Sequence, residues 1–204
     1  MDADENPVQL TKEKIHAALA RLAEAFKQAG ITGEICIYGG TAMVLAFDAR
    51  EATRDIDAVF VPPTIFRELA AKIAEEMNLP SSWLNDGVKG FRSAKESIIE
   101  DGMPQFDNLR VTRPSAEYLL AMKCLAARVS GYDTAGDRAD VEFLIRHLGL
   151  SKAGDILHIV ESYYPADRIS VKTRYFIEEI MADLSSSSSG QPGQNPIPPT
   201  TPNL

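Results

Sequence analysis

Two aspartates, Asp55 and Asp57, stand in an otherwise apolar segment, "DIDAVFV". Side chains alternate across a β-strand, so the two carboxylates share one face, about 7 Å apart along the backbone, while Ile56, Ala58 and Phe60 share the other. Like charges this close repel each other, and removal from water increases the cost. A divalent cation relieves both effects. The oxygen ligands favour Mg²⁺, or the similar Mn²⁺, which binds one or two carboxylates together with substrate phosphates.

A pair of glycines precedes these aspartates. Gly39 and Gly40 follow the apolar stretch "EICIY", and Thr41 is the expected N-cap of a short helix. Glycine lets a phosphate approach the backbone closely, and a helix N-terminus presents free N–H groups with partial positive charge. The glycines and Thr41 are therefore predicted to bind the phosphates of a metal–triphosphate complex. Arg54, next to the aspartates, is expected to pair with them or with phosphate.

Apolar periodicity predicts the elements that position these residues. Helical spacing covers 11–28, and further helices are expected to begin at Thr41 and Thr64. Short apolar segments predict strands at 34–38, 55–61 and 108–112. The segment "AKESIIE" is predicted as a helical turn between the last two strands. Together these elements indicate a small mixed sheet with helices packed against it.

After Pro114 the pattern predicts helices only, at 115–129, 137–147, 151–163 and 170–184. The expected fold class is α/β (α+β), with a small mixed-sheet core followed by a helical bundle. The predicted domains are an α/β domain at 1–112, a helical domain at 113–184 and a tail at 185–204. The tail is rich in Ser, Pro, Gly and Asn, and this composition predicts disorder.

The first motif resembles the signature of the DNA polymerase β-like nucleotidyltransferase fold: Tyr38-Gly39-Gly40, fourteen residues, then Asp55-Ile56-Asp57. "GGTAM" and "TRDIDAVF" are similar to its AbiEii-type branch, which is known from toxin–antitoxin and phage-defence loci. "EYLLAMKCLAAR" looks like the lysine-containing helix of that branch, and "DRADVEFL" looks like its Asp-x-x-Asp helix start. "WLNDGVKGF" is similar to a related uncharacterised subgroup. The resemblance covers the chain from Ile35 to Leu150.

This resemblance implies transfer of a nucleoside monophosphate from a nucleoside triphosphate to a hydroxyl of RNA, such as a tRNA-like end, or of protein, with Mg²⁺. It makes Asp55 and Asp57 metal ligands, Lys123 a catalytic triphosphate contact and Asp140 a catalytic or base-positioning residue of the second domain. The family also has a third metal-binding carboxylate on a later strand. "NLRVT" has none, and Asp107 is the nearest candidate. A cognate antitoxin or toxin is a further implied partner.

Simpler interpretations compete with these roles. Asp55 could cap a strand while Asp57 faces solvent, and Asp137 and Asp140 fit ordinary helix-start chemistry. Lys123 could extend along the helix to reach solvent. A second functional interpretation is a nucleotide- or partner-binding module, antitoxin-like, that keeps the fold and has lost turnover. The missing third carboxylate favours this second interpretation.

Composition restricts the class of protein. The 204 residues are 45% apolar and 25% charged, as in ordinary globular domains, and the formal net charge is −8. That balance argues against general coating of nucleic acid, which needs a basic excess, but it allows a local basic site. The acidic N-terminus does not resemble a signal peptide, and no apolar run approaches the roughly 18 residues of a membrane span. A soluble, cytoplasmic protein without a membrane partner is expected.

Overall fold

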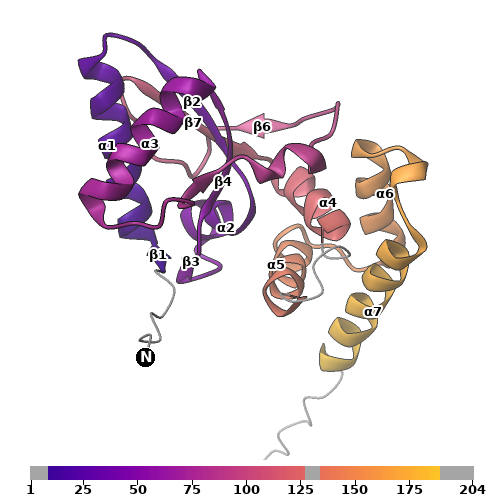
Figure 1. Ribbon diagram of the computed structural model, residues 1–204. Helices are drawn as coiled ribbons and strands as arrows, with labels where there is room; N and C mark the ends of the chain where they lie inside the picture. The colour runs from indigo at the N-terminus through magenta and orange to yellow at the C-terminus, as the bar shows by residue number, and fades with distance from the viewer. Residues whose placement is uncertain (1–8, 127–133, 189–204) are drawn as a thin grey trace, which may run out of the picture.

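The computed structural model describes residues 9–126 and 134–188, which form an α/β unit and a helical unit side by side (Figure 1). The predicted α/β (α+β) class with a mixed sheet and a following set of helices is confirmed. The sheet ends at Pro114, slightly beyond the predicted domain boundary at 112. No helix in the described ranges is both long and apolar enough to cross a membrane.

A five-stranded mixed sheet forms the centre of the α/β unit. Its strand order is β5 (Leu84–Asn85), β4 (Ile56–Val61), β2 (Gly33–Ile37), β7 (Leu109–Pro114) and β6 (Ile98–Ile99). Strand β2 is antiparallel to β4 and parallel to β7. The end of β2 and the start of β4 therefore lie next to each other, at the same end of the strands. A separate short pair is formed by β1 (Leu10–Thr11) and β3 (Ala52–Thr53).

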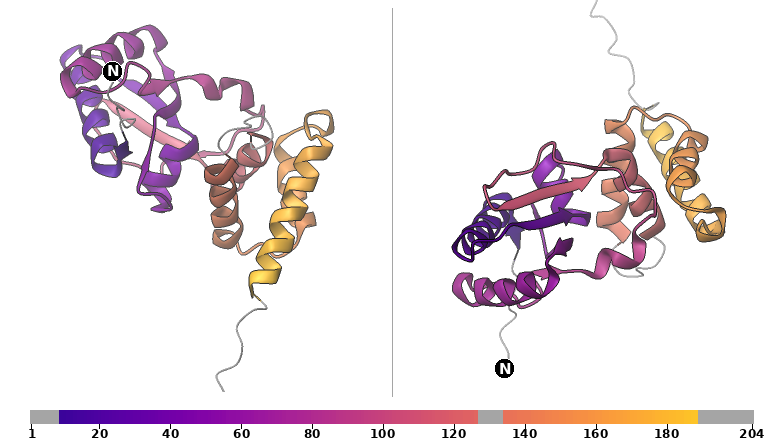
Figure 2. Two further views of the ribbon diagram at one scale, coloured as in Figure 1. Left: turned by 60° about the horizontal axis from the view of Figure 1, so that its bottom comes forward. Right: turned by 90° about the horizontal axis from the view of Figure 1, so that it is seen from above.

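Three helices belong to this unit: α1 (Lys12–Gln28), α2 (Gly39–Phe47) and α3 (Pro63–Met77). Helices α1 and α3 pack together on the part of the sheet remote from the helical unit (Figure 2). They bury the apolar face of β4, whose alternate residues Ile56, Ala58 and Phe60 are in the core. The opposite face of β4, which carries Asp57, therefore faces the helical unit.

The helical unit consists of α4 (Ala116–Ala126), α5 (Thr134–His147), α6 (Ala153–Tyr163) and α7 (Val171–Ser188). Every residue of α4 from Tyr118 to Leu125 is buried, because the helix lies between the sheet and the other three helices. Two hydrogen bonds connect the segment between α6 and α7 to the 3₁₀ segment η1 (Gly87–Phe91). Tyr164 donates to the Phe91 carbonyl at 2.6 Å, and Arg168 donates to the Gly90 carbonyl at 2.9 Å.

Several predicted elements were wrong in detail. The segment "AKESIIE" contains strand β6 in place of a helical turn, because Ile98 and Ile99 complete the sheet by pairing with β7. Helix α2 begins at Gly39 with Tyr38 as its N-cap residue, so Thr41 lies inside the helix. Proline at the first helical position starts α3 at Pro63, one residue before the predicted Thr64.

The C-terminal boundary also differs from the prediction. Helix α7 continues to Ser188, past the predicted end at Leu184, and Leu184 packs against the core of the helical unit. The Ser185 and Ser186 hydroxyls donate to the carbonyls one turn earlier, which satisfies these polar groups within the helix. The rest of the predicted tail, 189–204, and residues 127–129 of the predicted fourth helix lie outside the described residues.

Candidate functional site

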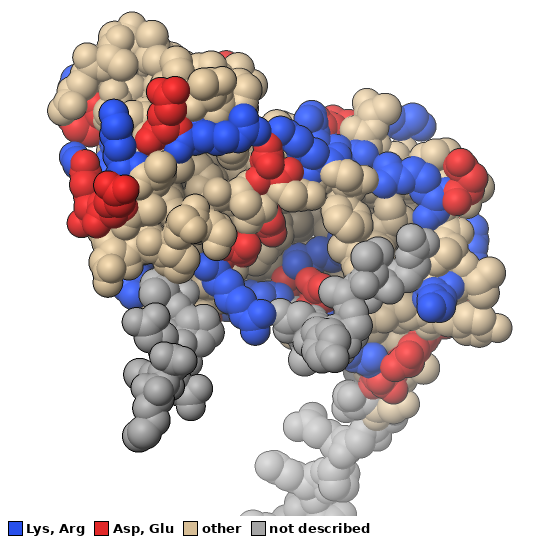
Figure 3. Space-filling view, in the orientation of Figure 1, with Lys and Arg blue, Asp and Glu red and all other residues tan. Residues whose placement is uncertain are grey.

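A cavity of about 540 Å³ lies between helix α4 and the end of the sheet where β2 ends and β4 begins. This volume is within the range of about 300–1,000 Å³ that is typical of small-molecule sites. Figure 3 shows the molecule hollowed between the two units, with acidic and basic side chains at the hollow. Most of the residues predicted to do chemistry line it: Gly39, Gly40, Arg54, Asp55, Asp57 and Lys123.

Asp55 and Asp57 form the acidic side of this cavity. Both are half-buried, and Asn85 on the neighbouring strand β5 donates from Nδ2 to Asp55 Oδ2 at 2.9 Å. Burial raises the pKa of the Asp55 carboxyl, and the adjacent charge of Asp57 raises it further. Burial likewise raises the pKa of Asp57. Asp57 therefore lies in the cavity wall, where its carboxylate is partly removed from solvent.

The glycine pair keeps the start of α2 close to these carboxylates. Gly39 has a left-handed φ of 59°, and a Cβ placed on it would lie 3.0 Å from Asp57 Oδ2. A Cβ on Gly40 would lie 2.7 Å from Thr53 Oγ1. The Thr41 hydroxyl donates to the Asp55 carbonyl at 2.8 Å. Thr41 is absent from the cavity lining, so it braces the Asp55 backbone, and the prediction that it binds phosphate is not supported.

Gly39→Ala tests how tightly this turn constrains Asp57. We expect it to destabilise the fold by more than Gly30→Ala, which serves as the matched control. Gly30 also has a positive φ, 67°, but a Cβ there meets nothing within 4 Å. The control should cost only the conformational term of about 1–2 kcal/mol. Urea denaturation of both variants gives the comparison. Equal losses would show that the contact between Gly39 and Asp57 carries no constraint.

Lys123 and Asp140 are joined in a buried ion pair on the opposite wall. The Lys123 side chain is 7% exposed, and its Nζ lies 2.5 Å from Asp140 Oδ2 and 3.3 Å from Asp137 Oδ1. Lys123 lines the cavity, so the interpretation that it extends to solvent is wrong. Asp140 is 2% exposed and absent from the lining, whereas Asp137 lines the cavity. Asp140 is therefore placed to orient cations, and the predicted direct catalytic role for it is not supported.

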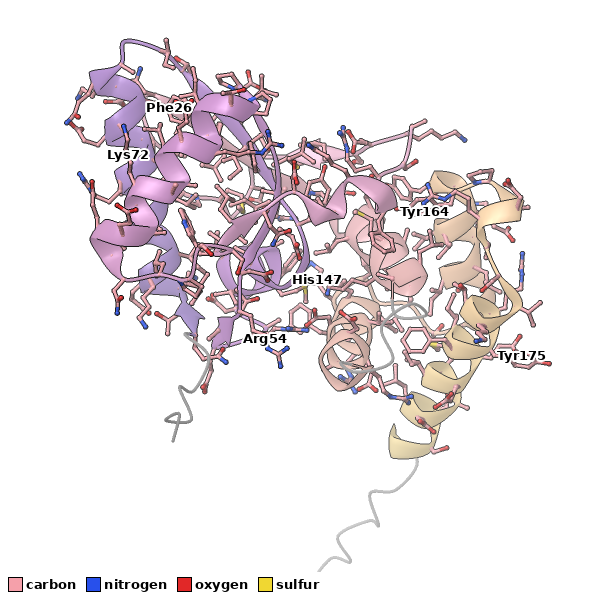
Figure 4. All side chains as sticks on the ribbon, in the orientation of Figure 1. Phe26, Arg54, Lys72, His147, Tyr164 and Tyr175 are labelled. Atoms are coloured by element: carbon pink, nitrogen blue, oxygen red, sulfur yellow. The ribbon has the colours of Figure 1, made fainter. Side chains whose placement is uncertain are left out.

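The two remaining predicted site residues lie in different places. Arg54 is exposed at the edge of the α/β unit (Figure 4) and lines the cavity, and its charge offsets a small part of the rise that burial causes in the pKa of Asp55. Asp107 precedes β7, at the end of the sheet opposite Gly39, where Gly33 N–H donates to the Asn108 carbonyl. The prediction of Asp107 as a metal ligand is wrong, because β7 runs parallel to β2 and takes its first residues away from the aspartates.

Sequence reasoning missed Arg50, which lines the cavity, and Asn85, which holds Asp55 from outside the lining. Arg50 lies in the polar turn "DAREATR", where nothing in the local pattern separates it from its charged neighbours. Asn85 reaches Asp55 because the short strand β5 pairs with β4 in parallel. The adjacency of these strands would have indicated Asn85, but a strand of two residues has no periodicity to detect.

The carboxylates at the cavity restrict the kind of metal ion that it could hold. Within the described ranges, no group of three or more His, Cys, Asp or Glu residues gathers as a metal site, and β7 contains no carboxylate. Asp55 and Asp57 fit a Mg²⁺ or Mn²⁺ ion that takes its other ligands from substrate phosphates and water. Burial raises the pKa of both carboxyls, and the nearby charges of Arg54 and Lys123 offset this only in part, so a divalent cation would stabilise the ionised pair.

The raised carboxyl pKa values predict a pH dependence of stability. The native state binds protons more tightly than the unfolded chain, whose aspartates titrate near 3.8, so this stability is present below that pH and is lost as pH rises through the native pKa values. In EDTA, the free energy of unfolding of wild type should therefore fall relative to that of Asp57→Asn as pH increases from about 4 to about 8. Urea denaturation of both proteins across that range measures the difference. A gap independent of pH would contradict the prediction.

Comparison of the chain with protein-family models, with curated proteins and with solved structures found no match.

Proposed function

We propose that this protein is a metal-dependent nucleotidyltransferase that moves a nucleoside monophosphate from a nucleoside triphosphate to a hydroxyl of RNA or protein. One observation carries the proposal: a single cavity brings the half-buried pair Asp55 and Asp57 together with three cations, Arg50, Arg54 and Lys123. The acidic pair suits a divalent cation, and the cations suit phosphate oxygens. The motif resemblance to AbiEii-type proteins supports the same reaction.

Different residues of the cavity would bind the metal ion, the phosphates and the nucleobase. Asp55 and Asp57 would hold Mg²⁺, which when bound supplies charge neutralisation and activation of the attacking oxygen. Lys123 donates toward the phosphates from α4, held in place by the buried Asp140 carboxylate. Val88, Phe91 and Met122 add apolar surface to the lining, which suits the faces of a nucleobase.

A labelling experiment tests the proposal. The protein is incubated with each nucleoside triphosphate, labelled at the α- or the γ-phosphate, with total RNA or total protein, in Mg²⁺ or in EDTA. We expect label from the α-phosphate only, release of pyrophosphate, and loss of the signal in EDTA. Digestion with ribonuclease or protease identifies the acceptor class. Transfer from the γ-phosphate, or no transfer to either acceptor, would contradict the proposal.

The absence of a carboxylate from β7 favours a second candidate function, a nucleotide-binding module without turnover. Such a module, antitoxin-like, would use the same cavity. It predicts Mg²⁺-dependent binding of triphosphates in calorimetry together with no labelling of RNA or protein. Binding and labelling measured on one preparation therefore separate the two candidates.

The motif resemblance further supports a role as a toxin or phage-defence component with a cognate partner. Induced expression of wild type should then arrest bacterial growth, whereas Asp57→Asn at the same protein level should not. Equal growth of the two strains would contradict this role without bearing on the transfer chemistry.

A further inference from the structure

Arg50 connects the two units through an unusually well-defined ion pair. It lies in the turn between α2 and β3, and its side chain reaches Asp140 on α5. Nε and Nη2 bind the two carboxylate oxygens of Asp140 at 2.6 and 2.7 Å. The Arg50 side chain is 27% exposed and the Asp140 side chain 2%. This is the two-pronged geometry that fixes the plane of a guanidinium group.

The remaining nitrogen of Arg50 points to the glycine turn. A Cβ on Gly40 would lie 3.4 Å from Arg50 Nη1, and both residues line the cavity. Nη1 is the nitrogen that the pair with Asp140 does not use. At the same place, the first N–H groups of α2 have no intrahelical acceptor, and the N-cap residue Tyr38 makes no side-chain capping bond. Donors from a side chain and from the backbone thus meet at one point of the wall.

The Asp140 carboxylate orients a second cation at the same time. Its Oδ2 lies 2.5 Å from Lys123 Nζ, so one fully buried anion holds Arg50 from the α/β unit and Lys123 from the helical unit. Both cations line the same cavity. Arg50 and Lys123 thus bring two positive charges, partly offset by Asp140 and Asp137, to the wall of one cavity, which suits a chain of phosphates with several negative charges in a row.

We propose that Arg50 binds the phosphate chain of the nucleoside triphosphate at the Gly39–Gly40 turn, and that Asp140 is the positioning residue that aims it. This inference rests on the proposed function and specifies how its substrate is recognised. A triphosphate offers the guanidinium more charged oxygens than a monophosphate does, so we expect Arg50 to favour triphosphates over monophosphates. Bound substrate connects the two units through Arg50 and Lys123.

Binding measurements on Arg50 variants test this role. Calorimetry in Mg²⁺ compares each nucleoside triphosphate with its monophosphate for wild type, Arg50→Ala and Arg50→Lys. Arg21→Ala is the control, since Arg21 forms an exposed pair with Glu76 outside the cavity. We expect Arg50→Ala to weaken triphosphate binding about tenfold to a hundredfold and monophosphate binding only slightly. Arg50→Lys should recover part of this loss, because lysine retains the charge without the two-pronged geometry.

The outcomes separate this inference from the proposed function. If wild type binds no triphosphate, the proposed function fails. If wild type binds and Arg50→Ala binds equally well, or loses triphosphate and monophosphate affinity equally, only the role of Arg50 is overturned. Full recovery in Arg50→Lys would overturn the aiming role of Asp140. Should Arg50→Ala be unfolded at the assay temperature, the ratio of triphosphate to monophosphate affinity in Arg50→Lys decides: an unchanged ratio overturns the inference, and a reduced ratio supports it.

Discussion

Asp57→Asn is expected to lower the rate of nucleotide transfer by about a thousandfold, the scale of losing one group aimed at developing charge. The same substitution should leave the metal-free protein at least as stable as wild type at neutral pH. Asparagine keeps the shape of the side chain and removes a half-buried charge that faces Asp55. Labelling in Mg²⁺ and urea denaturation in EDTA measure the two quantities on one preparation.

The matched control is Asp48→Asn. Asp48 is exposed, lies outside the cavity and has a left-handed φ of 49°, a conformation that asparagine also tolerates. Its substitution should change neither rate nor stability appreciably. A large loss of stability for Asp57→Asn in EDTA would instead identify Asp57 as a structural residue, and unchanged transfer would exclude it from the reaction.

Asp140→Ala is expected to cost about 3–5 kcal/mol of unfolding free energy, because it removes the shared partner of two cations, one of them buried. Asp137→Ala is the control. Asp137 contacts the same Lys123 at the longer distance of 3.3 Å and is partly exposed, so its removal should cost about 1 kcal/mol or less. Urea denaturation of both variants gives the comparison. If both variants lost only a small and equal amount of unfolding free energy, the ion pairs of Asp140 with Arg50 and Lys123 would not contribute to the stability of the fold.

The parts of the site that could be predicted are local in sequence. Alternation along a strand predicted that the Asp55 and Asp57 carboxylates would lie together, and both line the cavity, with Asp57 in β4 and Asp55 directly before it. The pair between Arg50 and Asp140 joins residues 90 positions apart, and no periodic pattern records it. It depends on how α5 is placed against the turn after α2, which only tertiary packing determines.

The error at Asp107 has a different origin. A short apolar segment predicts that a strand exists, but it contains no information about the direction in which that strand enters the sheet. In an antiparallel arrangement the residues before β7 would have met the aspartates. Because β7 is parallel to β2, Asp107 lies at the far end, and the aspartates take their polar neighbour from Asn85. Pairing partners and directions are long-range properties, since they follow from the burial of whole faces.

The two hydrogen bonds at Gly90 and Phe91 have a consequence for how this chain can be divided. Segment η1 supplies Val88 and Phe91 to the cavity, yet two of its backbone carbonyls accept hydrogen bonds from Tyr164 and Arg168, which follow α6. A fragment that stops after the sheet would keep the aspartates and lose the residues that hold η1 in place beside them. The cavity therefore depends on both units. Grafting the glycine–aspartate segment into another protein, or excising the α/β unit, would transfer the motif without the complete cavity.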